Sequence, residues 1–271
     1  MKDEKFQENL EGLTEQEKNK KEFNRLFGAF NLRSVQLEEM WVKLLDFKII
    51  SDNPKIFIGF SDITALHIAL NNLSNLITFH TPNPMYGLGS KNGLEPISEF
   101  YFWSLLMGQS NAYEIPFNIY GDSLRVKVLV PGAASGVLVG GNLSLICSVM
   151  GSKYEVRTGN SILFIEDVGE SPYRVDRYLQ ELKLAGKFDH INGLIIGRFS
   201  RRKTEEPDKP TDFKMEEVFR QYFSKLKVPV IYDFPSGHGS KNISIPFGAK
   251  VDINTENQLF KLLEQPVSID N

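Results

Sequence analysis

The sequence predicts an α/β protein of two domains, and three observations support this. The chain has 271 residues, of which 41% are hydrophobic, so it can bury a substantial core, and its length favours two modest domains over one. Beyond residue 131, short apolar runs alternate with segments of helical spacing, which is typical of α/β proteins. Pro131 and Gly132 follow a segment rich in Pro, Asn and Gly, so we place the boundary between domains 1–130 and 131–271.

The first domain has the less regular pattern. Residues 2–26 carry charges of both signs around a few apolar positions, which favours a solvated helix. An apolar run at 56–58 stops at Gly59, and residues 62–73 have helical spacing, so we expect a strand, a sharp turn and a helix. Residues 78–130 are rich in Pro, Asn, Gly and aromatic residues, and we expect loops and one short helix there.

The second domain alternates regularly between strands and helices. The expected strands cover residues 137–139, 162–165, 194–196 and 228–232. The expected helices cover residues 143–150, 173–184 and 215–226. The charged segment 201–212 carries both signs, so we interpret it as a solvated loop and not as an anion site.

Composition excludes several classes of protein. The formal net charge is -3 and cations and anions are mixed along the chain, so a nucleic-acid partner is not expected. The single cysteine, Cys147, excludes an internal disulfide and a cysteine metal cluster, and its apolar surroundings favour a buried, inert thiol. No apolar stretch approaches the roughly 18 to 20 residues of a membrane span, so we expect no membrane association and a cytoplasmic location by default.

Ser61 is a candidate nucleophile. In Gly59-Phe60-Ser61-Asp62 it lies where a buried strand turns abruptly into a helix, a geometry that exposes a hydroxyl and directs backbone N–H groups to the same point. A serine nucleophile also requires a general base within hydrogen-bond reach and a third group that orients the base. The second glycine of a Gly-x-Ser-x-Gly motif is absent, so a plain helix N-cap is the alternative interpretation.

Glu166 and Asp167 are candidates for the orienting acid. They end the apolar run 162–165, and the carboxyl ends of strands are where ligands and catalytic side chains gather in α/β proteins. The alternative is that one of these carboxylates only caps a turn.

Of the four histidines, His238 is the best candidate for a general base. It lies in Pro235-Ser236-Gly237-His238-Gly239-Ser240, where no apolar neighbour explains it as a packing residue. His80 lies among loop residues and is a candidate to line a cleft, whereas His67 falls within an apolar helix and is expected in the core. His190, in a polar connection, has no evident task.

Metal and nucleotide sites are not supported by the sequence. It contains no His-Glu-x-x-His motif or paired histidine spacing, and its acids do not cluster with histidines. Gly140-Gly141-Asn142 lacks both a Walker lysine and a full Gly-x-Gly-x-x-Gly.

Taken together, four blocks resemble the LD-carboxypeptidase (muramoyltetrapeptide carboxypeptidase) family of serine peptidases, which also contains the microcin C immunity peptidases. They occur in the order expected for that family, which makes the set far more specific than any one block. The blocks are NPKIFIGFSDITALH at 53–67, GGNL at 140–143, IEDVGESPYRVDR at 165–177, and the Gly237-His238 pair with IPFGA at 245–249.

The resemblance implies a catalytic triad in which Ser61 is the nucleophile, His238 is the general base and then acid, and Glu166 orients the imidazole. It also implies that the backbone N–H of Asp62 is one oxyanion donor, and Asn142 is a further candidate cleft residue. Family members cleave the bond between an L-configured centre and a terminal D-alanine of cell-wall stem peptides. The implied cycle is acylation of the serine with release of D-alanine, followed by hydrolysis of the ester.

The fold implied by the resemblance is an N-terminal doubly wound (flavodoxin/Rossmann-like) domain carrying the serine and a C-terminal α/β domain carrying the glutamate and histidine. The site would lie in the cleft between them. The resemblance also implies a homodimer and the absence of any metal or organic cofactor. The implied substrate is a small peptide, either a muropeptide in peptidoglycan recycling or a peptide antibiotic.

The N-terminal domain is expected to be incomplete here. The family's opening strand and its Gly-Gly-Tyr-Gly turn have no counterpart before residues 42–47, which leaves the second oxyanion donor open. Three interpretations follow: a truncated start, a divergent active enzyme, or a homologue that binds peptides without cleaving them. The competing enzyme class, an ordinary α/β-hydrolase esterase, would predict a second elbow glycine and a different acid block.

Overall fold

The computed structural model describes residues 42–82, 89, 93–108, 113–121, 125–200, 214–239 and 241–267. The described residues from Leu44 onward belong to one compact unit. The helix predicted within residues 2–26 and the charged loop predicted at 201–212 lie outside the described residues. In the described part of the chain, no helix combines the length and the apolar character needed to cross a bilayer.

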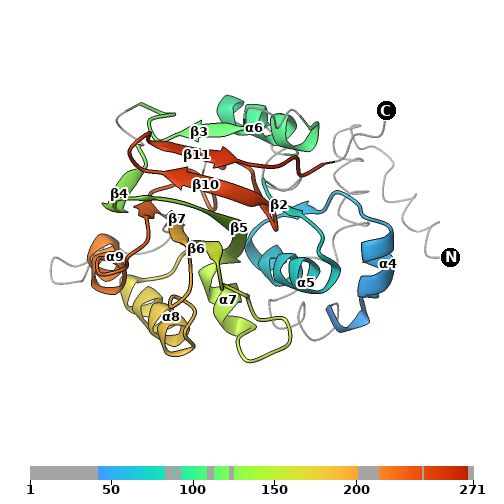
Figure 1. Ribbon diagram of the computed structural model, residues 1–271, viewed down its shortest axis with the longest axis horizontal. Coiled ribbons are helices and arrows are strands. Elements are labelled where there is room, and N and C mark those ends of the chain that lie inside the picture. The colour runs from blue at the N-terminus through green and yellow to red at the C-terminus, as the bar shows by residue number, and fades with distance from the viewer. Residues whose placement is uncertain are drawn as a thin grey trace, which may run out of the picture. The chain divides into compact units, whose positions relative to one another are not determined.

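Strands and helices alternate along most of the described chain (Figure 1). The helices, including the short 3-10 turns η3 and η4, are η3 (Val42–Leu44), α4 (Phe47–Asp52), η4 (Ser61–Ile63), α5 (Thr64–Ser74), α6 (Pro96–Leu106), α7 (Leu143–Ser148), α8 (Pro172–Leu184) and α9 (Met215–Phe223). The strands are β1 (Ile58–Gly59), β2 (Thr78–His80), β3 (Glu114–Pro116), β4 (Lys127–Val130), β5 (Ala133–Asn142), β6 (Ser161–Val168), β7 (Gly193–Ser200), β8 (Val230–Tyr232), β9 (Ile245–Phe247), β10 (Lys250–Asn254) and β11 (Leu259–Leu262).

The larger sheet has the strand order β3-β11-β10-β5-β6-β7-β8-β4, and its centre, β5 to β8, is parallel. Antiparallel strands complete it on both sides, and a smaller sheet pairs β1, β2 and β9. The central strand β6 is buried at every position from Ser161 to Asp167, as expected for a parallel strand covered on both faces. The register between β5 and β6 pairs Asn142 with Glu166 at the carboxyl end of the sheet.

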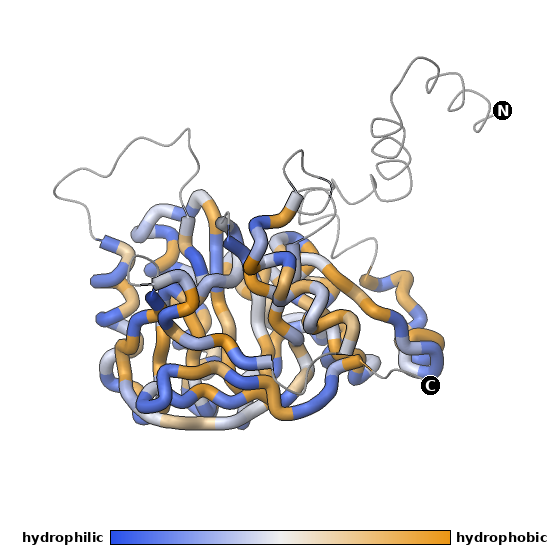
Figure 2. Tube along the Cα trace, turned by 90° about the horizontal axis from the view of Figure 1, so that it is seen from above, coloured by the Kyte–Doolittle hydropathy of each residue, from blue (hydrophilic) through white to orange (hydrophobic). Residues whose placement is uncertain are grey.

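Each face of the larger sheet is covered by its own hydrophobic cluster. Leu163 and Ile165 of β6 pack toward the helices α7, α8 and α9, whereas Ile162 and Phe164 pack toward the opposite side with residues of α6, β9 and β10. This alternation follows from the two-residue period of a strand. Figure 2 shows hydrophobic and hydrophilic residues interspersed along the described chain.

The predicted α/β class is confirmed, and the predicted elements from residue 133 to 232 match β5, α7, β6, α8, β7, α9 and β8. The expectation of loops and one helix over 78–130 was incomplete, because β2, β3 and β4 also lie there. These are strands of three or four residues whose positions depend on pairing with β9, β11 and β8, which are distant in sequence. The division into domains 1–130 and 131–271 stays a prediction.

Candidate functional site

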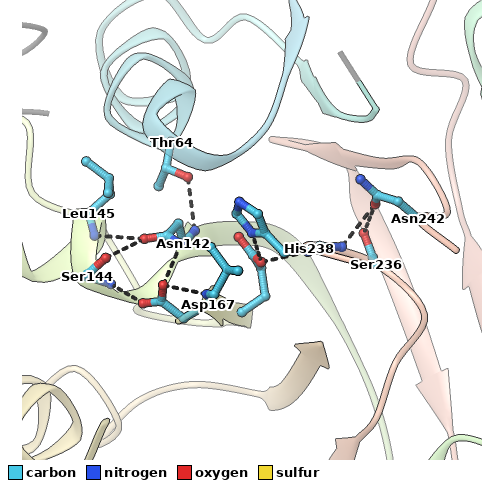
Figure 3. Close-up of polar contacts among 11 residues, drawn as sticks. Thr64, Asn142, Ser144, Leu145, Asp167, Ser236, His238 and Asn242 are labelled. Carbon is cyan, nitrogen blue, oxygen red and sulfur yellow. Dashed lines mark hydrogen bonds and ion pairs between the residues drawn. The ribbon is translucent and has the colours of Figure 1, made fainter. Parts of the chain in front are cut away.

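The candidate residues come from segments near the ends of strands, and Figure 3 shows Asn142 and His238 among them. Ser61 follows β1, Glu166 lies near the end of β6, and His238 lies in the loop after β8. Asn142, the last residue of β5, is beside Glu166 in the sheet. In a parallel sheet the carboxyl ends of neighbouring strands share one edge, so residues far apart in sequence converge there.

The backbone at Ser61 turns sharply. Phe60 is extended, with φ -155° and ψ -176°, and Ser61 has φ 62°, in the left-handed region that costs an L-residue about 1–2 kcal/mol. η4 begins at Ser61 and α5 follows directly. A side chain at Gly59 would lie 2.8 Å from Cγ2 of Ile63, so the turn also requires glycine there. The predicted strand, sharp turn and helix are therefore present.

Buried hydrogen bonds hold this turn in place. The carbonyl oxygen of Gly59 accepts the backbone N–H of Thr81 at 3.0 Å and Nε2 of His67 at 3.0 Å. Because a carbonyl only accepts, His67 carries its proton on Nε2. Burial lowers the pKa of His67 to about 4, partly offset by this bond to Gly59, so the ring is neutral near pH 7. The expectation that His67 belongs to the core is confirmed by its complete burial.

Thr64 connects the turn to the end of β5. Its Oγ1 accepts the backbone N–H of Asn142 at 2.9 Å (Figure 3). A side chain at Gly141 would lie 2.6 Å from both Cγ2 and Oγ1 of Thr64, so glycine permits this close approach. The GGN sequence therefore brings β5 against the start of α5.

Glu166 and His238 are in direct contact. Oε2 of the fully buried Glu166 accepts hydrogen bonds from the backbone N–H of His238 at 3.0 Å and from its Nδ1 at 2.7 Å. A side chain at Gly237, which has φ 107°, would lie 2.6 Å from the same carboxylate oxygen. The N–H of Gly237 also donates to Oδ1 of Asn242 at 2.9 Å, which anchors the loop (Figure 3).

Residues on both sides of Ser61 are close to His238. The ring centroid of Phe60 lies 4.8 Å from that of the imidazole. Burial raises the pKa of Asp62, and the charge of His238 partly offsets this rise. No hydrogen bond joins Ser61 to His238 among the described residues, and catalytic hydrogen bonds of this kind are often long before a substrate binds.

Asp167, the second acid of the pair, has a different environment. Its carboxylate accepts Nδ2 of Asn142 at 2.9 Å, the N–H of Ser144 at 2.9 Å and the N–H of Val168 at 2.8 Å. Burial raises its pKa to about 6, although these hydrogen bonds oppose the rise. The alternative in which one of the two carboxylates only caps a turn therefore applies to Asp167. Glu166 instead contacts His238.

The two candidate cleft residues are both buried. His80 is fully buried among the rings of Phe60, Phe164 and Phe247, and burial lowers its pKa well below the usual value. Asn142 is 2% exposed, and its Oδ1 caps α7 by accepting the N–H of Leu145 at 3.2 Å. The contacts that the structure gives both side chains are with protein groups, and their assignment to a cleft stays a prediction.

Two residues near the site were not singled out from the sequence. Thr64 lies three residues after Ser61, but its bond to Asn142 joins segments that only the fold brings together. Arg198 lies near the carboxyl end of β7, and its backbone pairs with Gly237 in the His238 loop. The strand-end argument that identified Glu166 could have found Arg198, because it follows the apolar run at 194–196.

Neither the thiol of Cys147 nor a metal-binding cluster adds chemistry to this site in the described part of the chain. The thiol of Cys147 is buried, and burial raises its pKa. Within the described ranges, no group of three or more His, Cys, Asp or Glu side chains is arranged to hold a metal ion.

Comparisons with protein families and curated proteins give consistent matches. The sequence profile of the LD-carboxypeptidase N-terminal domain matches residues 36–81, and that of the C-terminal domain matches residues 135–253. The Bacillus subtilis protein named “Probable murein peptide carboxypeptidase” is 36% identical over 211 residues, which cover 78% of this chain and 63% of that protein. This chain thus spans less than two thirds of that relative.

Two further relatives are covered more fully. The YocD protein of Bacillus subtilis is 30% identical over 241 residues, which cover 82% of this chain and 69% of YocD. The microcin C7 self-immunity protein MccF of Escherichia coli is 28% identical over 247 residues, which cover 83% of this chain and 70% of MccF.

Solved structures show the same fold. MccF in complex with aspartyl sulfamoyl adenosine superposes with a TM-score of 0.72 at 26% identity, covering 84% of this chain and 72% of that one. Muramoyltetrapeptide carboxypeptidase from Oxalobacter formigenes superposes with a TM-score of 0.74 at 22% identity, covering 87% of this chain and 77% of that one. At 22% identity, the similarity to the Oxalobacter formigenes enzyme concerns the fold alone.

Proposed function

The chain belongs to the LD-carboxypeptidase family, and from this premise we propose that it is a serine peptidase that releases a terminal D-alanine from cell-wall stem peptides. The observation that carries the proposal is the contact between Glu166 and His238 beside the strained turn at Ser61. A buried carboxylate that holds an imidazole next to a serine at a sharp strand-to-helix turn is the arrangement that activates a hydroxyl nucleophile.

The proposed roles follow from the hydrogen bonds of His238. Since Nδ1 is engaged by Glu166 at 2.7 Å, its proton lies on that side and Nε2 is left as the acceptor. Nε2 takes the proton of the Ser61 hydroxyl as Oγ attacks the carbonyl carbon of the scissile bond. The same proton then passes to the amine of the departing D-alanine. In the second half of the cycle, His238 accepts a proton from water as the water oxygen attacks the ester carbon, and it then returns this proton to Oγ of Ser61 as the ester bond breaks.

The backbone N–H of Asp62 is the proposed oxyanion donor. It belongs to the first turn of η4, where N–H groups have no intrahelical acceptor and point outward. Such a donor stabilises the negative oxygen of the tetrahedral intermediate, and loss of one donor in other enzymes lowers turnover by roughly 100- to 1000-fold.

A peptide antibiotic is a second candidate substrate. The specific observation behind it is the similarity to MccF, whose structures include complexes with aspartyl sulfamoyl adenosine and glutamyl sulfamoyl guanosine. The same nucleophile and base would act on an amide bond of either substrate class. A homologue that binds such peptides without cleaving them is the alternative, and the homodimer and the cytoplasmic location stay predictions.

Release of D-alanine from a purified stem tetrapeptide tests the proposal. We expect release by the chain and none by Ser61→Ala, while Ser224→Ala, which changes an exposed serine after α9, retains full activity. Thermal unfolding should be cooperative for all three proteins. Release that is unchanged in Ser61→Ala contradicts the triad, and the lack of release by folded chain favours the peptide-binding alternative. Hydrolysis of aspartyl sulfamoyl adenosine conjugates, tested in parallel, separates the two substrate classes.

A further inference from the structure

Arg198 has a buried hydrogen-bond donor that the described protein does not satisfy. Its Nη2 is buried and has no partner among the described residues. Its Nη1 lies 3.8 Å from Oδ1 of Asp233, at the limit of an ion pair, and the side chain is only 20% exposed. Buried donors are almost always satisfied, and an unpaired charged donor is especially unfavourable. The environment of Arg198 therefore favours an additional acceptor.

The nearest acid does not meet this need. Asp233 binds Lys127 more closely, with 2.9 Å between Nζ and Oδ2. Two cations thus share one carboxylate, and the closer of them is Lys127. A further cation, Lys241, lies three residues beyond His238, and its Nζ is 3.9 Å from the ring centroid of Tyr120. The hydroxyl of Tyr120 also donates to Oε2 of Glu95 at 3.4 Å, so the acids nearby already have other partners.

Arg198 lies directly beside the loop that carries His238. Its backbone N–H donates to the carbonyl of Ser236 at 3.1 Å, and its backbone pairs with Gly237. A side chain built on Gly239 would lie 3.8 Å from Cγ of Arg198, so the aliphatic part of the arginine passes close to the residue that follows His238. The backbone of Arg198 is therefore held beside the loop that carries the proposed base, and its side chain extends from there to within 3.8 Å of Asp233.

We propose that Arg198 binds the terminal carboxylate of the peptide substrate. This inference rests on the proposed function, because a carboxypeptidase must distinguish the free end of a peptide from an internal bond. A carboxylate is the acceptor whose geometry fits a guanidinium, with two parallel charge-assisted hydrogen bonds. It would satisfy the unpaired Nη2 of Arg198. Arg198 is then a determinant of specificity that acts on the leaving residue and not on the scissile carbonyl.

Binding can be measured without turnover in a Ser61→Ala background. The ligands are the stem tetrapeptide with a free terminal carboxylate and the same peptide with a terminal carboxamide, each titrated calorimetrically. We expect the carboxylate peptide to bind roughly 10- to 100-fold more tightly than the amide, the range for a hydrogen bond to a charged group. Adding Arg198→Gln should abolish this preference by weakening only the carboxylate peptide, and Arg198→Lys should retain part of it.

Lys127→Gln is the matched control, because it removes one cation that also contacts Asp233. If the effect of Arg198→Gln came from net charge or from an unpaired Asp233, Lys127→Gln would reproduce it. Equal weakening of both peptides in Arg198→Gln, a preserved preference for the carboxylate, or no binding of the carboxylate peptide would each overturn the inference. Failure of the proposed function is seen separately, as a lack of D-alanine release by the protein with Ser61 intact.

Discussion

Oε2 of Glu166 accepts two hydrogen bonds from a single residue, the backbone N–H of His238 at 3.0 Å and its Nδ1 at 2.7 Å. The main-chain bond fixes the loop and the side-chain bond fixes the ring, so the imidazole has one favoured orientation and one favoured tautomer. The other oxygen, Oε1, is buried without a partner among the described residues. Both hydrogen bonds that the Glu166 carboxylate accepts from described residues therefore come from His238.

Replacing Glu166 with Gln tests this relationship. Gln has nearly the same shape, but its amide can present N–H groups to Nδ1 and favour the wrong tautomer of His238. We expect kcat for D-alanine release to fall by roughly 10⁴-fold with little change in KM, as for loss of the acid in other triads. Glu181→Gln, at an exposed position of α8, is the control and should match the parent protein. A loss of less than tenfold would mean that Glu166 does not orient the base.

The left-handed backbone of Ser61 predicts an effect on stability. Because φ is 62°, glycine is favoured over any L-residue at this position, and Ser61→Gly should raise the free energy of unfolding by about 1 kcal/mol relative to Ser61→Ala. Both variants should lose turnover. Urea unfolding of the two proteins measures the difference, and equal stabilities would show that the backbone at residue 61 is unstrained in solution.

Gly237 and Gly239 provide a matched pair in the His238 loop. A side chain at Gly237 would lie 2.6 Å from Oε2 of Glu166 on a backbone with φ 107°, whereas at Gly239 its nearest contact would be 3.7 Å. Gly237→Ala should therefore cost about 1–3 kcal/mol of stability and most of the activity, since it displaces His238 from Glu166. Gly239→Ala should change the unfolding free energy by less than about 0.5 kcal/mol. Similar melting temperatures for the two variants would contradict the close approach of the loop to Glu166.

The regular part of the fold was predictable because local pattern and tertiary structure agree there. β6 and β7 contain continuous apolar runs at 162–165 and 194–196, and α8 has clear helical spacing, so their type follows from sequence. β10 and β11 were not identified, although they pair over four residues and extend the larger sheet. Their pattern is short, and their antiparallel pairing is decided by contacts with β5 and β3.

The candidate site also has residues that could be predicted from the sequence and features that could not. Ser61, the acid pair Glu166 and Asp167, and His238 could be proposed from strand-end and loop positions, and the structure brings Glu166 and His238 together. The burial of His80 could not be predicted, because it depends on aromatic residues from β6 and β9 that close over the ring. The unpaired Nη2 donor of Arg198 could not be predicted from the sequence either. Whether a donor finds an acceptor depends on where the fold places the acceptors.

Asp167 predicts a pH dependence of stability. Its pKa in the folded protein is raised to about 6 from 3.8, mainly by burial, so between these values the folded state binds more protons than the unfolded state. The stability contributed by the bound proton is complete below about pH 4 and is lost as the pH rises through about 6. Asp167→Asn keeps the side chain neutral throughout and removes this dependence.

Relative to Asp167→Asn, the parent protein should thus lose stability between about pH 4 and about pH 7, by roughly 3 kcal/mol. Urea unfolding over this range measures the difference, in which the titration of groups common to both proteins, such as His67, cancels. Asp252→Asn, on β10, gives the effect of removing a carboxylate elsewhere in the same sheet. A pH-independent difference between parent and Asp167→Asn would mean that Asp167 is ionised throughout. In that case its hydrogen bonds to Asn142, Ser144 and Val168 would outweigh the cost of burying its charge.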